Sequence, residues 1–286
     1  MSVRLRRIKT QWKTTNPADV SLVLTGTVAL ITTVLLYKLV LLPGRETFIG
    51  ELFCQRGEIP YVIAFLSVWA FVILVFKWTS QRAQAQPLQY ELLPADSVRG
   101  LGPEDSERVQ RHVLSPGFHP ARSFLVNRIM LALEHFERRK SVREVADILS
   151  AQADIDEARV ESSYGLLRFL IWAIPILGFV GTVLGISTAV SGFTISIEVA
   201  QDLEVVKRSL GQVTDGLAVA FDTTFVALVM AIVIMFITSA IQKAEEDVLQ
   251  RITQFCIENL LLRLAVSHGA VGFHNAQEAS QTKAES

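Results

Sequence analysis

Four long runs of apolar residues divide the chain, at 20–42, 59–76, 169–197 and 216–242. A helix needs about 20 mostly apolar residues to cross the hydrocarbon core of a bilayer, and all four runs are long enough. Lys38 is the one charge in the first run and Asp222 the one charge in the fourth, while the second and third runs carry none. The pattern predicts an all-α integral membrane protein with four transmembrane helices, over 20–42, 59–77, 166–193 and 215–242.

Between and after these runs, apolar residues recur at helical spacing among charges. Residues 79–103 are rich in Pro, Gly and Gln and predict an irregular linker, whereas 122–140 has the pattern of an amphipathic helix. Ser141 and Glu144 form a capping-box signature, and no proline follows until Pro175. The third membrane helix is therefore expected to begin well before the membrane, within a helical segment over 78–165. The fourth is expected to continue as a helix over 243–274, followed by a disordered tail over 275–286.

Lysine and arginine are distributed unevenly between the two sides, and this predicts the orientation. The N-terminal 19 residues carry five, the segment 77–168 carries thirteen and the C-terminal tail four, against two in each short loop. Both termini and the middle segment are expected in the cytoplasm, with outer loops over 43–58 and 194–214. Cys54 and Cys256 would then lie on opposite sides of the membrane. The first run is longer than the apolar core of a signal peptide, which favours an uncleaved anchor.

The composition narrows the function. Half of the residues are hydrophobic, 19% are charged and the net charge is −1. A soluble domain carries about 25% charged residues, and a disordered chain is poor in apolar ones. There is no basic excess to suggest a nucleic-acid partner. The sequence also lacks a phosphate-binding loop, an H-E-x-x-H or a G-x-S-x-G motif, so we expect neither an enzyme nor a bound cofactor or metal.

The third run contains a row of glycines beside a proline. Gly178, Gly181 and Gly185 fall on one face of a helix, and small residues let membrane helices approach closely. Pro175 leaves a backbone carbonyl free and permits a kink. For Thr182, within this row, a packed hydroxyl and a pore-lining hydroxyl are equally compatible with the sequence.

The fourth run contains the single intramembrane acid, Asp222. A charge near the centre of a membrane helix costs roughly 2.5–3.5 kcal/mol on insertion scales, so such a residue is a functional candidate by default. The alternative is a structural bond to a neighbouring hydroxyl or lysine. Thr223 and Thr224 follow it directly, and we include Asp222, Thr223 and Thr224 with Thr182 in a candidate ion pathway.

These two runs resemble a known family. The string I-P-I-L-G-F-V-G-T-V-L-G ends at Gly185, and G-L-A-V-A-F-D-T-T ends at Thr224. Together they look like the MotA/TolQ/ExbB proton-channel family, over roughly 160–265. The four-span layout resembles the MotA side of the family, and the A-F-D-T-T wording resembles its ZorA subgroup.

The resemblance implies an A-type subunit of a membrane motor or proton channel driven by an ion-motive force, in a bacterial inner membrane. Such subunits form a homo-oligomer, a pentamer, around a dimer of a single-span MotB/TolR/ExbD-like partner. The family's two pore threonines match Thr182 and Thr224 here. The transported ion would be H⁺, with Na⁺ as an alternative. One charge crossing 100 mV releases about 2.3 kcal/mol, which is the energy available to such a motor.

Two other functions remain open on the residues alone. A solute transporter often has inverted repeats and helices broken at the midplane, but here the first two spans do not resemble the last two, and only Pro175 suggests a break. A structural membrane scaffold would use Asp222 as a packing residue.

Overall fold

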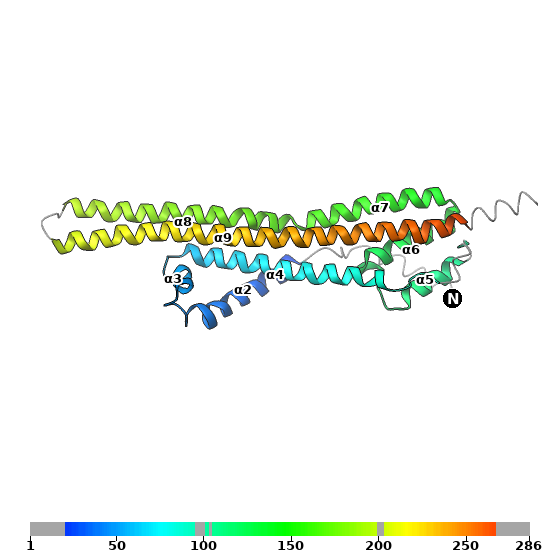
Figure 1. Ribbon diagram of the computed structural model, residues 1–286, viewed down its shortest axis with the longest axis horizontal. Coiled ribbons are helices and arrows are strands. Elements are labelled where there is room, and N and C mark those ends of the chain that lie inside the picture. The colour runs from blue at the N-terminus through cyan, green and yellow to red at the C-terminus, as the bar shows by residue number, and fades with distance from the viewer. Residues whose placement is uncertain (1–20, 95–100, 103–104, 199–202, 267–286) are drawn as a thin grey trace, which may run out of the picture. The chain divides into compact units, whose positions relative to one another are not determined.

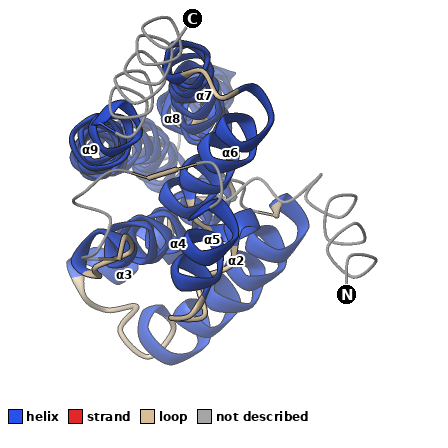
Figure 2. Cartoon of the chain, turned by 90° about the vertical axis from the view of Figure 1, so that its right-hand side faces the viewer, coloured by secondary structure: helices blue, strands red, loops and turns tan. Residues whose placement is uncertain are grey.

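The computed structural model describes residues 21–94, 101–102, 105–198 and 203–266, and every regular element in these ranges is helical (Figure 2). Four of the helices are long and apolar enough to cross a membrane, over Leu22–Leu41, Ile59–Gln89, Val142–Ser191 and Val206–Val266. The prediction of an all-α protein with four spans is therefore confirmed. The third and fourth helices are longer than the about 20 residues that a bilayer requires.

The chain divides into two units. The first, which we call the membrane unit, comprises 20–77 and 164–241. The second, the helical unit, contains 78–163 and the chain from 242 onwards. Figure 1 shows the order of the helices, of which α4 (Ile59–Ala85) and α9 (Leu203–Phe255) contribute residues to both units.

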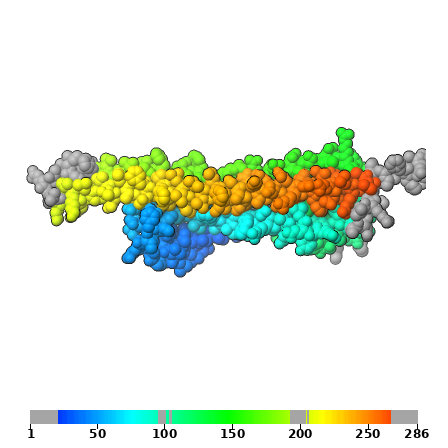
Figure 3. Space-filling view, viewed as in Figure 1, coloured from blue at the N-terminus to red at the C-terminus, as the bar shows by residue number. Residues whose placement is uncertain are grey.

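In the membrane unit, α8 (Gly165–Glu198) and α9 lie side by side (Figures 1 and 3). Helix α2 (Leu22–Leu36) continues as a π-helical turn, η1 (Tyr37–Leu41), and a hydrogen bond ties it to α4, because Trp69 Nε1 donates to Thr25 Oγ1 at 3.3 Å. Much of the apolar surface of α8 and α9 is exposed, including Trp172, Phe179 and Phe236. Such a surface suits lipid or a neighbouring membrane helix rather than water.

The helical unit has a core of its own. The helices of this unit are α5 (Ser106–Leu114), α6 (Phe124–Arg139), α7 (Val142–Ser163) and the last part of α9, which continues as the π-helical turn η6 (Cys256–Leu261). The amphipathic pattern over 122–140 forms α6, which buries Leu125, Ile129, Leu133 and Phe136. Gln84 fixes the start of α6, because its amide donates to Arg122 O at 2.6 Å and accepts from Phe124 N at 3.0 Å.

Several helices extend further than the hydropathy pattern predicts. Helix α4 runs to Ala85, into the expected linker, and a helix, α3 (Phe48–Cys54), occupies part of the expected loop 43–58. Helices α8 and α9 also fill 194–198 and 203–214 of the expected loop 194–214. The physical reason is that a charge ends an apolar run but not a helix, and no proline follows Pro175. The expected N-terminal segment 1–19 and tail 275–286 lie outside the described residues.

Candidate functional site

The glycine row of α8 packs closely against α9. A Cβ at Gly185 would lie 2.6 Å from both Ala220 N and Gly216 O, and one at Gly178 would lie 2.5 Å from Ala227 Cβ. Such distances are too short for real atoms, so a side chain at either position would push the helices apart. The approach is reciprocal, because a Cβ at Gly216 would lie 2.7 Å from Gly185 O. The glycines thus allow backbone-to-backbone contact between α8 and α9.

Two threonine hydroxyls meet at this contact. Thr182 on α8 and Thr224 on α9 form a hydrogen bond through their Oγ1 atoms. Each hydroxyl also bonds to a backbone carbonyl of the other helix. Thr182 Oγ1 lies 3.1 Å from Ala220 O on α9, and Thr224 Oγ1 lies 3.0 Å from Gly178 O on α8. Two hydroxyls have only two protons for these three bonds, so the pair can exchange donor and acceptor roles. Both side chains remain partly exposed.

Thr223 has a different environment from its neighbour. Its side chain is buried, and its hydroxyl donates to Val219 O at 2.8 Å, within its own helix. A Cβ at Gly181 would collide with its side chain. The geometry therefore places Thr223 in the packing between α8 and α9. Pro175 lies inside α8, which continues through it.

Asp222 faces an arginine. Arg56 Nε lies 2.7 Å from Asp222 Oδ2, and Arg56 Nη2 donates to Glu51 Oε1 at 2.8 Å. The Nε–H of Arg56 is not aligned for a hydrogen bond, so its contact with Asp222 is an electrostatic ion pair. The Arg56 and Asp222 side chains are 20% and 27% exposed, and partial burial strengthens their attraction relative to a surface pair. The intramembrane acid is thus neutralised from the segment between the first two spans.

A second ion pair is buried in the helical unit. Arg128 Nε donates to Asp156 Oδ2 at 2.8 Å, Arg128 Nη1 donates to Thr253 Oγ1 at 2.7 Å, and both partners of the ion pair are at most 2% exposed. Gln152 Nε2 donates to Asp156 Oδ1 at 2.8 Å, and Arg159 Nη1 lies 3.7 Å from the same oxygen. The network joins α6, α7 and α9. Sequence reasoning did not find it, because mixed charge on amphipathic helices is the normal pattern of a solvated face.

Sequence reasoning missed the pairing of Arg56 with Asp222. The usable signal was that an intramembrane acid needs a partner and that Arg56 is one of the two basic residues between the first two spans. The described residues contain no group of three His, Cys, Asp or Glu side chains that would hold a metal ion. The site combines a close helix pair, two hydroxyls that can exchange donor and acceptor roles, and one neutralised acid.

The fold and the site define a multi-pass, all-α membrane protein whose last two spans form a tight, hydroxyl-bearing pair. Residues 118–254 match the model of the MotA/TolQ/ExbB proton channel family, which covers α6, α7, α8 and nearly all of α9. Residues 118–254 are therefore similar to this family, and the resemblance read from the sequence is confirmed over that segment. The family is one of proton channels in energy-transducing complexes, which generally work with a single-span protein such as MotB, TolR or ExbD. No curated protein and no solved structure matches the chain significantly.

Proposed function

We propose that this protein is the A-type subunit of a motor driven by an ion-motive force, in which Thr182 and Thr224 line the ion path. The observation that carries the proposal is the hydroxyl pair between α8 and α9, within the segment that matches the proton-channel family. The ion is H⁺, with Na⁺ as the alternative, and the membrane is a bacterial inner membrane with both termini in the cytoplasm. The Lys/Arg distribution supports this orientation.

The chemistry of the hydroxyl pair suits a partner carboxylate that alternates between charged and neutral forms. A hydroxyl donates to a carboxylate and accepts from a carboxylic acid, so the pair can stabilise both forms in turn. The bonds from each threonine to the opposite helix are of ordinary length, 3.0 and 3.1 Å, and can be exchanged for bonds to a ligand. A carboxylate on a single-span MotB/TolR/ExbD-like helix would then step past the pair as it binds and releases a proton.

The oligomer follows from the same proposal. A pentameric ring of this chain around a partner dimer would place α8 and α9 of each copy towards the centre. The large apolar side chains exposed on α8 and α9 support lateral contacts between copies as well as with lipid. In this arrangement Asp222 lies at the outer entrance of the ion pathway, where the ion pair with Arg56 neutralises its charge and holds its side chain in place.

Substitution of both hydroxyls tests the proposal. The protein is co-purified with its single-span partner and reconstituted in vesicles, and ion flux is driven by an imposed potential. Thr182→Val with Thr224→Val keeps the shape but removes both hydroxyls, and the flux should fall at least about tenfold, the effect of one unmade hydrogen bond to a charged group.

Two matched controls accompany this test. Thr182→Ser with Thr224→Ser retains the hydroxyls and should retain most of the flux. Thr188→Val removes an exposed hydroxyl that bonds only within α8, to Leu184 O at 3.0 Å, and should leave the flux unchanged. If the double valine variant conducts like the parent protein, the pair serves packing alone, and the scaffold alternative is favoured. Cryo-EM of the same complex reports whether the copies form a ring around a central helix pair.

A further inference from the structure

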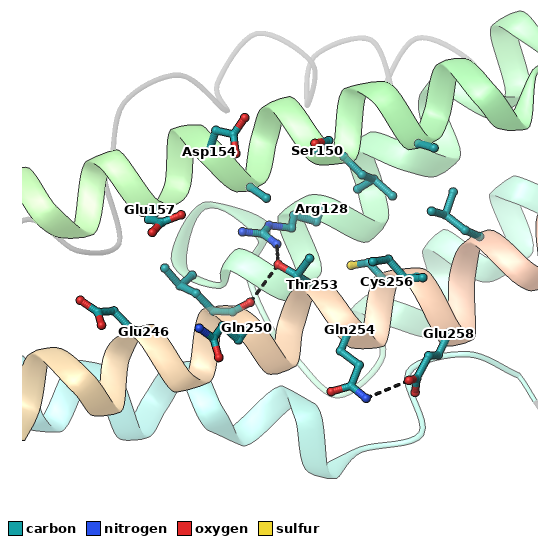
Figure 4. Close-up of a pocket in the computed structure, with 16 residues that line it drawn as sticks. Arg128, Ser150, Asp154, Glu157, Glu246, Gln250, Thr253, Gln254, Cys256 and Glu258 are labelled. Carbon is teal, nitrogen blue, oxygen red and sulfur yellow. Dashed lines mark hydrogen bonds between the residues drawn. The ribbon is translucent and has the colours of Figure 1, made fainter.

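A groove in the helical unit has a composition that the ion pathway does not explain. Its volume is about 870 Å³, and it lies between α7 and the last part of α9, with Arg128 of α6 in the gap between them (Figure 4). Its floor is apolar, formed by Ala146, Leu149, Ala153, Leu249 and Leu261, and the half-exposed Ile257 also lines the groove. This volume is in the range of a binding pocket and much larger than a packing defect.

The rim of the groove is acidic. Its charged residues other than Arg128 are all carboxylates, namely Asp154, Glu157, Glu246 and Glu258. All four are exposed, and none of them forms an ion pair with another described residue. Arg128 does not offset this charge, because Asp156 already neutralises it. Glu157 and Glu246 come from opposite helices and lie at the same end of the gap (Figure 4).

These properties favour a peptide segment over a small ligand. Small-ligand sites orient their ligand with a few convergent polar groups that are free to bind it. The one buried cation in this groove is already bonded to Asp156 and Thr253. An apolar floor between two helices with carboxylates along the rim instead fits an amphipathic segment that carries apolar and basic residues on adjacent rows.

We propose that the occupant is the basic N-terminal segment of this protein, residues 1–19. The segment has five basic residues, Arg4, Arg6, Arg7, Lys9 and Lys13, and one acid, Asp19. On a helix, Leu5, Ile8 and Trp12 would form an apolar row, and Arg6, Lys9 and Lys13 would form a basic row directly beside it. The C-terminal segment 267–286 has one lysine against two glutamates, so it lacks the complementary charge.

The four-span topology brings the segment and the groove to the same side of the membrane. An even number of spans places the chain before the first span and the chain after the fourth on one side, whichever way the protein is inserted. The segment between the second and third apolar runs, 77–168, contains α6 and α7 and lies on that side too. The docking is therefore compatible with either orientation, and it does not depend on the proposed ion pathway.

Cysteine cross-linking in native membranes tests the docking with the full-length chain. The background is Cys54→Ser with Cys256→Val, and Gln11→Cys places a thiol in the segment. Ala153→Cys places the second thiol on the floor of the groove, whereas Ala158→Cys places it on α7 at an exposed position outside the groove. A short bismaleimide should link position 11 to position 153 at least about tenfold faster than to position 158.

Charge reversal adds a second readout. Arg6→Glu, Lys9→Glu and Lys13→Glu should slow the link to position 153 about tenfold, since three rim pairs become repulsive. Asp154→Lys, Glu157→Lys and Glu246→Lys in the same chain should restore it. Equal reaction at 153 and 158, or no reaction at 153, overturns the proposal. In that case, binding of a peptide of residues 1–19 to vesicles with anionic lipid, but not to neutral vesicles, would identify the membrane surface as the partner.

Discussion

Arg56 Nε lies 2.7 Å from Asp222 Oδ2, so a residue between the first two spans neutralises the one acid of the fourth apolar run. Arg56 also holds Glu51 at 2.8 Å, which fixes the guanidinium between two carboxylates. The contact links the segment around α3 to α9 inside the membrane unit. It gives Asp222 a structural partner, and this changes which experiment can establish a role in ion movement.

The two partners of this ion pair should respond unequally to substitution. Asp222→Asn leaves Arg56 with Glu51, whereas Arg56→Gln leaves Asp222 without a cation among the described residues. We expect Arg56→Gln to lower the free energy of unfolding by about 1–3 kcal/mol, since an unpaired charge is left in a partly buried site. Asp222→Asn should cost less, and the double variant should recover most of the loss. Thermal unfolding in detergent measures the coupling energy in a double-mutant cycle.

The double variant also separates a fixed charge from a proton carrier. If Asp222 is fixed by Arg56, the vesicle flux should persist in Arg56→Gln with Asp222→Asn, which leaves the net charge of the site unchanged. Loss of flux in this stably folded variant would show that the Asp222 carboxylate itself carries the proton.

The sequence predicted which residues of α8 and α9 contribute to this site, but it did not predict which residues pair across the fold. The glycine row and the threonines lie within a few turns of each other on two helices, so helical periodicity alone brought them to adjacent faces. Arg56 and Asp222 are far apart in the chain, and periodicity within a helix holds no information about such a pair. The same is true of Arg128 and Asp156, whose burial depends on how α6 and α7 pack. Hydropathy likewise located the spans but not the helix ends, because backbone hydrogen bonding continues where charges begin.

Glycine substitutions on α8 and α9 should have opposite effects. A Cβ at Gly185 would lie 2.6 Å from the backbone of α9, so Gly185→Ala should destabilise the helix pair by about 1–3 kcal/mol through overpacking. Gly211 on α9 has open space around it, and Gly211→Ala should stabilise the protein by about 0.5–1 kcal/mol through helix propensity. Unfolding midpoints of the two variants provide the comparison. A shift of the same sign in both would contradict the close approach at Gly185.

The buried ion pair in the helical unit should be sensitive to removal of one partner. Arg128→Met leaves the buried Asp156 carboxylate with only the more distant guanidinium of Arg159, at 3.7 Å, so the cost should be about 3 kcal/mol, the lower end for breaking a buried ion pair. Arg128→Lys should not rescue it, because the Arg128 bonds to Asp156 and Thr253 use two nitrogens in a fixed geometry. Arg128→Met with Asp156→Leu should be more stable than Arg128→Met alone. Limited proteolysis of the helical unit would rank the three variants, and equal sensitivity of the single and double variants would argue against a stabilising pair.

The two cysteines should differ strongly in reactivity. Cys256 is buried in the helical unit, beyond the apolar run, and burial raises the pKa of its thiol to about 12, while Cys54 is partly exposed. The thiolate is the reactive form, so at pH 8 only roughly one Cys256 thiol in ten thousand would be reactive. A maleimide should therefore label Cys54 in the folded protein and Cys256 only after unfolding. Mass spectrometry of the digested protein identifies the labelled site.

The pH dependence of this difference has a definite sign. In the unfolded chain the Cys256 thiol titrates near pH 8.5, whereas the folded chain holds its proton until the pH approaches 12. Above pH 8.5 the unfolded state binds fewer protons than the folded state, so this thiol lowers the stability of the fold as the pH rises. Cys256→Val removes the titrating group, and its unfolding midpoint should fall less between pH 8 and 10 than that of the parent protein. An identical fall in both proteins, or labelling of Cys256 as fast as Cys54 at pH 8, would contradict a buried neutral thiol.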